Sequence, residues 1–331
     1  GDTLFLGDVG RPDLAIKSDL TKEDLAGMLY HSLRDKIMPL ADDVIVYPAH
    51  GAGSACGKNL SKETVGILGE QKQTNYALRA DMSEEDFVKE VLDGMPPPPQ
   101  YFAKNAMMNK SGYDPFEIVL KKGNTPLEID DFEAIANHES ALVLDVRPEH
   151  EFITGHIPNS IFIGIHGAFA PWVGALIPDL KQPILLVTPE GKEKETVTRL
   201  SRVGYDNTIG YLKGGFANWK ASGKDVDILD SISADEFTHK SNVQNLNILD
   251  VRKSGEHQSM YLNLKGVENF PLDFINDNLH TIDKTKTYHI HCAGGYRSVI
   301  AASILKARGF FNLVNIEGGF EELKKTGVQM S

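Results

Sequence analysis

The sequence has little of what marks secreted, membrane-spanning and nucleic-acid-binding proteins. It contains only two cysteines, Cys56 and Cys292, far apart in the chain, so it has no disulfide framework and both thiols are expected to be free in a reducing compartment. It has no apolar run of about 18 residues, the length that a membrane-spanning helix needs. It has no basic stretch either, and its formal net charge of −12 and pI of about 5.4 argue against nucleic acid and anionic lipid as partners. These absences favour a cytoplasmic protein that acts on small molecules and leave a homo-oligomer open.

What the sequence does have is an internal repeat. Three landmarks recur in the same order at offsets of 105 or 104 residues: Leu-Asp-Val-Arg at 144–147 and 249–252, Gly-Gly-Phe at 214–216 and 318–320, and Gly-x-x-Asn at 204–207 and 309–312. Such a match predicts two copies of one domain. We place the copies at 125–226 and 227–331, and call them the first and the second repeat.

Each repeat alternates short apolar runs with helical patterns. In the second repeat, residues 247–249, 287–291 and 314–316 are predicted strands, and residues 299–306 form a predicted helix that ends at Gly309. Alternation of this kind is typical of an α/β fold with a parallel sheet. In such a sheet the reactive loops lie at the carboxyl ends of the strands.

Residues 1–110 lie outside the repeat. A strand-like run spans 3–6, residues 44–47 have the pattern of a short buried strand, and residues 61–93 are mostly helical in pattern. Four prolines at 96–99 predict a stiff connector, and residues 121–126 give a second boundary signal. Because the chain begins with Gly1 rather than methionine, we interpret it as part of a longer protein, in which a targeting signal cannot be assessed.

Cys292 lies at the end of a predicted strand and starts a glycine-bearing loop that enters a helix. Successive N–H groups of such a loop form a cradle for an anion, and the helix N-terminus adds partial positive charge. Both effects favour the thiolate, the nucleophilic form of cysteine. Arg297 is expected to place a charge on a bound anion or to stabilise the loop, and Ser298 to cap the helix or to donate a hydrogen bond. The predicted site consists of the catalytic pair Cys292 and Arg297 and a cradle of Ala293, Gly294, Gly295, Tyr296 and Ser298.

This loop resembles the active-site loop of the rhodanese family, and with the landmarks at 249–252 and 317–320 the resemblance spans essentially the whole second repeat. It implies that Cys292 accepts a sulfane sulfur, becomes a persulfide and passes the sulfur to another thiol or nucleophile. Four residues separate Cys292 from Arg297, which is the spacing of the sulfur-handling loop, whereas cysteine phosphatases have five. A phosphatase and a purely structural cysteine are the alternatives that this spacing and the flanking landmarks disfavour.

The first repeat has no cysteine at the matching position. A count of 104 residues back from Cys292 reaches Thr188, and the same count from Arg297 reaches Glu193. A hydroxyl without a nearby base is a weak nucleophile, and a carboxylate would repel an anionic sulfur donor. We therefore expect the first repeat to be a non-catalytic rhodanese-like domain that serves as a scaffold.

Several charged or titratable residues are expected to be structural. The Asp-Arg pairs of the first landmark occur in both repeats, active and inactive, which indicates a role in the fold. His156 is placed in the same class. His289 and His291 flank the strand before Cys292; we expect them to face opposite sides of the sheet, and neither is assigned as a base. The two pairs are Asp145 with Arg147 and Asp250 with Arg252.

The N-terminal residues resemble late metal-binding motifs of the metallo-β-lactamase fold. The motifs are Gly-Asp-Thr at 1–3 and Tyr-Pro-Ala-His-Gly at 47–51. The resemblance makes Asp2 a metal ligand and places His50 where some members bind a second metal or support the first. The family's H-x-H-x-D-H segment and its next ligand histidine are missing from this sequence, and His31, in a helical stretch, is the only other histidine nearby. We expect those ligands to precede Gly1 in an intact protein.

The combination resembles the bacterial persulfide dioxygenase–rhodanese fusion proteins, as do the segments 10–13 and 50–57. It implies that, in the intact protein, Fe(II) oxidises a low-molecular-weight persulfide to sulfite, and that the rhodanese interconverts sulfite, sulfane sulfur and thiosulfate. Arg11 would position substrate or stabilise the fold, and Cys56 would meet persulfide near the iron or fill a tight loop as a small apolar residue. The thiol carrier is left open among glutathione, coenzyme A, bacillithiol and sulfide itself.

The predicted fold is α/β throughout: the C-terminal part of a metallo-β-lactamase αββα sandwich, followed by two tandem rhodanese domains with parallel sheets. A mononuclear iron site usually takes two histidines and a carboxylate, so we expect this 331-residue chain to bind iron weakly or not at all. One alternative is another metal-dependent hydrolase, such as a thioesterase or a glyoxalase-like enzyme, with rhodanese appendages. Another is a non-catalytic scaffold that relays persulfide to a partner.

Overall fold

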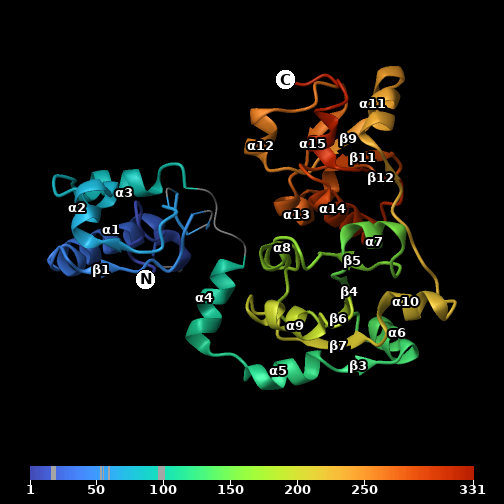
Figure 1. Ribbon diagram of the computed structural model, residues 1–331, viewed down its shortest axis with the longest axis horizontal. Helices are drawn as coiled ribbons and strands as arrows, with labels where there is room; N and C mark the ends of the chain where they lie inside the picture. Colours follow the sequence, from blue (N-terminus) through green and yellow to red (C-terminus); the bar gives the residue numbers. More distant parts are fainter. Residues whose placement is uncertain (16–19, 53, 55, 59, 96–100) are drawn as a thin grey trace. The chain divides into compact units, whose positions relative to one another are not determined.

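A computed structural model describes residues 1–15, 20–52, 54, 56–58, 60–95 and 101–331. The chain divides into two compact units, Gly1–Gly112 and Tyr113–Ser331 (Figure 1). The predicted proline connector at 96–99 lies outside the described residues, as do Gly53 and Ala55 of the segment 50–57. Within the described ranges, the helices are all too short or too polar to span a bilayer.

The second unit contains two five-stranded sheets in which all strand pairs are parallel. The first sheet has the order β3-β7-β6-β4-β5 and the second the order β8-β12-β11-β9-β10, so each strand of one repeat has a counterpart at the same place in the other. This arrangement confirms the predicted α/β fold. The strands of the first repeat are β3 (Pro126–Leu127), β4 (Leu142–Asp145), β5 (Ile161–Phe162), β6 (Ile184–Val187) and β7 (Thr208–Leu212). Those of the second are β8 (Ser231–Ile232), β9 (Asn247–Asp250), β10 (Val267–Asn269), β11 (Tyr288–His291) and β12 (Leu313–Ile316).

Helices cover both faces of each sheet, as parallel sheets require. In the second repeat, Phe237 and Phe320 pack against Ile248 and Ile316 on one face, while α14 lies on the other (Figure 1). The helices of the first repeat are α6 (Ile129–His138), α7 (Glu149–Thr154), α8 (Phe169–Leu176), α9 (Glu193–Ser201) and α10 (Gly215–Ala221), and α5 (Phe116–Gly123) directly precedes the repeat. Those of the second are α11 (Ala234–Val243), α12 (Ser254–Ser259), α13 (Ile275–Asn278), α14 (Tyr296–Ala307) and α15 (Gly319–Leu323), with 3-10 turns η4 (Leu272–Phe274) and η5 (Leu279–Thr281).

The boundary signal at 121–126 does not separate two folded parts. Helix α5 ends inside this segment, at Gly123, and packs against α9 and β7 of the first repeat. Gly123 fits closely there: a β-carbon on it would lie 2.8 Å from Val197 and 3.1 Å from Thr208. The two units instead divide between Gly112 and Tyr113.

The first unit is mainly helical among its described residues. Its elements are η1 (Pro12–Ala15), α1 (Lys22–Ser32), η2 (Leu33–Ile37), β1 (Ile45–Val46), β2 (Gly66–Ile67), α2 (Leu68–Thr74), η3 (Tyr76–Leu78), α3 (Glu84–Leu92) and α4 (Phe102–Ser111). The strand prediction for 3–6 is wrong: Leu4, Phe5 and Leu6 are buried, but the run forms only one isolated bridge, Leu4 to Val9, because the chain turns back at Gly7, where φ is +83°. The buried-strand prediction for 44–47 is wrong in part: Val46 is buried, but Ile45 and Tyr47 are 55% and 65% exposed. Ile45 and Tyr47 point to the face opposite Val46, so only one face of this strand is covered.

Candidate active site

Cys292 directly follows β11, the central strand of the second sheet, and starts the loop into α14. Its side chain is 1% exposed, and Gly295 N–H donates a hydrogen bond to the Cys292 Sγ at 3.1 Å. Gly295 adopts a φ of +99°, a conformation that favours glycine, and this turn directs its N–H back toward the sulfur. The first N–H groups of α14 have no acceptor within the helix, so the helix presents further donors at this end.

Ser298 lies inside the first turn of α14 rather than at its cap, because the helix begins at Tyr296 and Gly295 takes the cap position. The cap prediction for Ser298 is therefore wrong, since the helix starts earlier than the apolar pattern indicates. The Ser298 hydroxyl donates to the Gly295 carbonyl at 2.9 Å and lies 3.7 Å from the Cys292 Sγ. It thus braces the turn and touches the sulfur.

The N-terminus of α15 holds the other end of the loop. Phe320 N–H donates to the Cys292 carbonyl at 2.7 Å, and Glu321 N–H donates to the Ala293 carbonyl at 2.9 Å. A β-carbon on Gly319 would lie 2.5 Å from the first of these oxygens, so only glycine allows this close approach. The recurring Gly-Gly-Phe landmark signals this contact, although sequence analysis did not assign it a role. Ala293 is half-buried and Gly294 is exposed, which leaves this part of the loop open to solvent.

Arg297 forms a two-pronged ion pair with Glu256 of α12, with N–O distances of 2.6 and 2.7 Å. Its hydrogen bonds lower the pKa of Glu256, and the same contact raises the pKa of Arg297. Of the two roles expected for Arg297, this geometry supports stabilisation of the loop. Sequence analysis missed Glu256, but a signal exists: an Arg-x-x-x-Glu spacing recurs in both repeats, as Arg147–Glu151 and Arg252–Glu256.

The Asp-Arg pairs are buried inside their repeats, in keeping with a structural role. Arg252 binds Asp250 through Nε and Nη2, with a shortest distance of 2.6 Å, and also donates to the Met260 carbonyl at 2.8 Å. His257 adds a 2.8 Å contact from Nδ1 to the same carboxylate. Burial alone would raise the pKa of Asp250, but the hydrogen bonds from Arg252 and His257, together with nearby positive charge, hold it at about 2.

His289 and His291 face the same side of the sheet, which corrects the expectation of opposite sides. Residues two apart in a strand point the same way. The His289 ring packs near Phe237 of α11 and the His291 ring near Phe320 of α15, each with centroids 5.9 Å apart. Burial lowers the pKa of both imidazoles to about 4, so they are neutral core residues near pH 7. His156 is similar: it stacks on Phe152, and burial lowers its pKa to about 4.

Thr188 takes the place of Cys292 in the first repeat, directly after β6, and Glu193 starts α9. The Glu193 carboxylate turns into the loop, where it accepts from Gly191 N–H at 3.2 Å and lies 3.3 Å from the Thr188 hydroxyl. The loop thus carries its own anion. The glycine-rich helix start that contacts this loop also lies further from it than in the second repeat. A β-carbon on Gly215 would lie 3.4 Å from the Thr188 carbonyl oxygen, whereas one on Gly319 would lie 2.5 Å from that of Cys292.

A cysteine at position 188 is therefore expected to be inactive. In the double variant Thr188→Cys with Cys292→Ser, the carboxylate of Glu193 would face the new sulfur and repel an anionic donor. We expect its sulfur-transfer rate from thiosulfate to equal that of Cys292→Ser alone. A rate within about tenfold of the wild type, where electrostatic cradles commonly contribute a hundredfold or more, would show that the first loop is competent after all.

Asp2 and His50 lie together in the first unit, with 3.1 Å between Asp2 Oδ1 and His50 Nε2. Both side chains are substantially exposed. Among the described residues, no group of three or more His, Cys, Asp or Glu side chains is arranged to hold a metal ion. The two donors of this pair do not make up an iron site, which usually needs two histidines and a carboxylate, so no chemical step is assigned to iron here.

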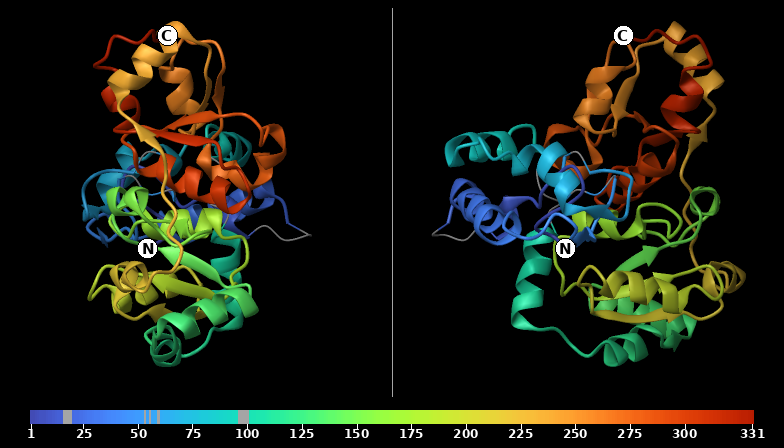
Figure 2. Two further views of the ribbon diagram at one scale, coloured as in Figure 1. Left: turned by 90° about the vertical axis from the view of Figure 1, so that its right-hand side faces the viewer. Right: turned by 60° about the vertical axis from the view of Figure 1, so that its left-hand side comes forward.

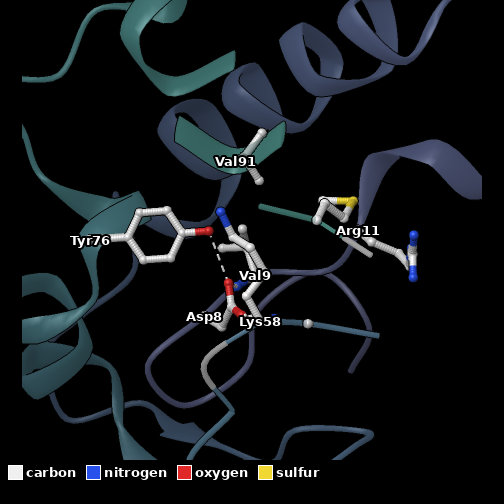
Figure 3. Close-up of a pocket in the computed structure, with 8 residues that line it drawn as sticks. Asp8, Val9, Arg11, Lys58, Tyr76 and Val91 are labelled. Atoms are coloured by element: carbon white, nitrogen blue, oxygen red, sulfur yellow. Dashed lines mark hydrogen bonds between the residues drawn. The ribbon is translucent and has the colours of Figure 1, made fainter. Parts of the chain in front are cut away.

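Arg11 is buried, and its guanidinium pairs with Asp13 at 2.6 and 2.8 Å. It lies on the wall of a small pocket in the first unit (Figure 3). There the buried Asp8 carboxylate accepts hydrogen bonds from Tyr76 Oη at 2.9 Å and from the Lys58 N–H at 2.5 Å. The pocket is lined by Asp8, Val9, Arg11, Gly57, Lys58, Tyr76, Val91 and Met95.

Cys56 is half-buried in the loop beside this pocket, and its N–H donates to the Ser54 hydroxyl at 3.2 Å. Cys56 and Cys292 belong to different units, and neither forms a disulfide.

The sequence model of the rhodanese-like domain matches this chain twice, at residues 128–222 and 233–326. The Bacillus subtilis (strain 168) protein named "Putative sulfur carrier protein YrkF" is 29% identical over 111 residues, which are 33% of this chain and 57% of that protein. YqhL of the same organism is 25% identical over 95 residues, 29% of this chain and 72% of its own length.

A crystal structure of a metallo-beta-lactamase from Staphylococcus aureus subsp. aureus COL is 30% identical, with a TM-score of 0.52, over 64% of this chain and 57% of that one. The first unit matches part of that structure. The chain spans little more than half the length of both YrkF and the staphylococcal protein. Because the family match covers more than half of the chain, the protein belongs to the rhodanese-like family and carries two rhodanese domains in tandem.

Proposed function

We propose that the protein is a sulfurtransferase that carries sulfane sulfur on Cys292. The observation that carries this proposal is the 3.1 Å hydrogen bond from Gly295 N–H to the Cys292 Sγ, in a loop at the end of the central strand of a rhodanese domain. This N–H and the unpaired donors at the start of α14 stabilise negative charge on the sulfur and on a second sulfur bound to it. The name of the relative YrkF, a sulfur carrier, agrees with this chemistry.

The transfer needs two displacements and no oxidant. The Cys292 thiolate attacks the sulfane sulfur of thiosulfate or of a thiol persulfide and forms a new S–S bond. The donor's bond to that sulfur breaks, and sulfite or the carrier thiolate leaves with the electron pair. An acceptor thiolate, cyanide or sulfite then attacks the outer sulfur, and Cys292 leaves as the thiolate. Arg297 keeps its charge next to the loop while Glu256 fixes its direction.

Mass spectrometry of the protein after incubation with thiosulfate tests this proposal. We expect one added sulfur atom on the peptide that contains Cys292, its loss on addition of cyanide, and thiocyanate as the product. No added sulfur and no thiocyanate would overturn the proposal. A stable persulfide on Cys292 that small acceptors do not remove would favour the relay scaffold instead.

We further propose that, in the whole protein, the first unit belongs to a persulfide dioxygenase domain that supplies sulfite to the rhodanese. The support is the similarity of this unit to part of a metallo-beta-lactamase structure and the proximity of Asp2 to His50. The substrate would be a low-molecular-weight thiol persulfide, and Fe(II) would supply the reaction with oxygen. A hydrolase with two bound metals is the competing proposal for the same domain.

Iron content and oxygen uptake decide between the persulfide dioxygenase and the hydrolase. The 331-residue chain is expected to keep less than about 0.1 iron per chain after dialysis, since two donors do not complete a site, and to consume no oxygen with a persulfide. A chain extended with the histidine-bearing segment that the family resemblance implies should bind about one iron and consume oxygen. Stoichiometric iron in the 331-residue chain would contradict the ligand assignment, and an inactive extended chain would favour the hydrolase.

A further inference from the structure

Tyr296 connects the loop of Cys292 to the first repeat. Its hydroxyl donates a hydrogen bond to the Gly164 carbonyl at 2.6 Å, and its ring packs edge-to-face on Phe162, with centroids 5.7 Å apart. Burial raises the pKa of this phenol, so it stays protonated and remains a donor. Tyr296 is the first residue of α14 and directly follows Gly295, whose N–H contacts the sulfur.

The first repeat leaves room for this ring by having two glycines. A β-carbon on Gly167 would lie 2.3 Å from the ring carbon Cζ of Tyr296, and one on Gly164 would lie 3.1 Å from its Cε2. Neither glycine has a positive φ, so the backbone conformation does not require glycine at either position. At Gly167 the requirement is space for Tyr296 alone, whereas a β-carbon on Gly164 would also lie 2.9 Å from the ring of Phe162, on which Tyr296 packs.

Two further contacts hold α14 near the first repeat, one directly and one through Asp227. The Phe162 N–H, on the edge strand β5, donates to the Ser303 hydroxyl at 3.0 Å. Lys306 Nζ lies 2.8 Å from Oδ1 of Asp227, whose backbone pairs with His156 of the first repeat. Figures 1 and 2 show α14 next to β5. The helix that starts the catalytic loop is therefore fixed to the first repeat along its length.

We propose that Tyr296 is a positioning residue through which the first repeat, which has no cysteine, sets the geometry of the Cys292 cradle. The proposal rests on the proposed sulfur chemistry of Cys292. The loop contains two adjacent glycines, Gly294 and Gly295, and such a segment needs support at both ends to keep one conformation. The N-terminus of α15 holds it at Cys292 and Ala293. Tyr296 holds it where α14 begins.

The test compares Tyr296→Phe with Tyr205→Phe in a Cys56→Ser background, in which Cys292 is the only thiol. Tyr205 is a matched control, because its buried hydroxyl also donates to a carbonyl, that of Ile177, inside the first repeat. Two quantities are measured for each: kcat and KM of sulfur transfer to cyanide, and the rate of Cys292 alkylation by iodoacetamide. Thermal unfolding of each variant shows how much stability it has lost.

Loss of the Tyr296 hydroxyl should lower kcat about fivefold, as the loss of one hydrogen bond of ordinary strength would, with little change in KM. It should also speed up alkylation, because the buried thiol becomes more accessible as the loop loosens. Tyr205→Phe should lower the unfolding temperature without changing kcat or alkylation. If Tyr296→Phe behaves like Tyr205→Phe, or like its parent, the proposal is wrong.

Gly167→Ala tests the same contact from the first repeat. Its methyl group should displace the Tyr296 ring and reproduce the kinetics of Tyr296→Ala, and the double variant should be no slower than Tyr296→Ala alone, because both changes remove one interaction. Effects that multiply in the double variant would contradict a shared contact. The alkylation assay also separates this proposal from the proposed function. If the wild-type protein transfers no sulfur, the proposed function is wrong. The alkylation rates of the wild type and the Tyr296 variants still test whether Tyr296 positions the loop.

Discussion

Cys292→Ser is expected to lower the rate of sulfur transfer at least about a thousandfold, which is the order of loss seen when a covalent nucleophile is removed. The hydroxyl that replaces the thiol is a poor nucleophile at neutral pH and cannot form a persulfide. Serine is close to cysteine in size, and its oxygen can accept the hydrogen bond from Gly295 N–H that Sγ accepts now. The buried position should therefore keep its packing, and the loss should be chemical rather than structural.

Thiocyanate formation from thiosulfate and cyanide measures this effect, and circular dichroism with thermal unfolding checks the fold. Cys56→Ser is the matched control, because Cys56 is the other cysteine of the chain and lies in the other unit. It should transfer sulfur at the wild-type rate. More than about a tenth of the wild-type rate in Cys292→Ser, where a true nucleophile would leave far less, would exclude Cys292 as the sulfur acceptor.

The local features of the active loop could be predicted from sequence because they depend on neighbours in the chain. A strand that ends at a cysteine, two glycines and the start of a helix follow one another between residues 288 and 307, and the structure has them in that order. The repeat predicted the shared topology of the two sheets for the same reason, since the landmarks lie where a strand ends, where a helix begins, or in the loop between a helix and the next strand.

The contacts that hold the loop could not be predicted, because they come from distant segments. Glu256 is 41 residues from Arg297, and Gly164 is 132 residues from Tyr296. Such partners are set by how sheets and helices pack, which periodicity does not reveal. The recurring Arg-x-x-x-Glu spacing was the one sequence signal for Glu256. The sequence carries no comparable signal for the contact between Tyr296 and Gly164, because it depends on how the two repeats pack.

Arg252→Met is expected to destabilise the second repeat by about 3–5 kcal/mol, the usual cost of removing one partner of a buried ion pair. Asp250 is fully buried, and without Arg252 its carboxylate would keep the hydrogen bond to His257, the bond to the residue 252 N–H and the 3.9 Å contact with His291, but would lose its guanidinium partner. The variant also loses the hydrogen bond to the Met260 carbonyl and the stacking of the guanidinium 3.7 Å above the Phe320 ring. Adding Asp250→Asn should recover part of the loss, because the uncompensated charge is then gone.

Calorimetry of the full chain measures this loss of stability, and tryptophan fluorescence shows which of the two repeats has lost it. Both tryptophans, Trp172 and Trp219, lie in the first repeat, so Arg252→Met should lower a calorimetric transition more than the fluorescence transition. An exposed ion pair gives the control: Lys325→Met removes the contact to Glu322 and should change stability by less than about 0.5 kcal/mol. If Arg252→Met lowers the free energy of unfolding by less than about 1 kcal/mol, the buried pair of Asp250 and Arg252 does not stabilise the second repeat as proposed.

The pH dependence of the same variant follows from the sign of the pKa shift. The pKa of Asp250 is about 2 in the folded protein, below the value of about 3.9 in an unfolded chain. Its ionised form therefore stabilises the fold above about pH 4, and this contribution is lost as the pH falls toward 2. In Arg252→Met the carboxylate of Asp250 has lost its main partner. Protonation of Asp250 therefore raises the stability of the variant, whereas it lowers the stability of the wild type. The stability difference between them should shrink as the pH falls from about 4 toward 2, the interval between the unfolded and folded pKa of Asp250. A difference that stays constant over this range would show that lost packing, not the charge of Asp250, accounts for the effect.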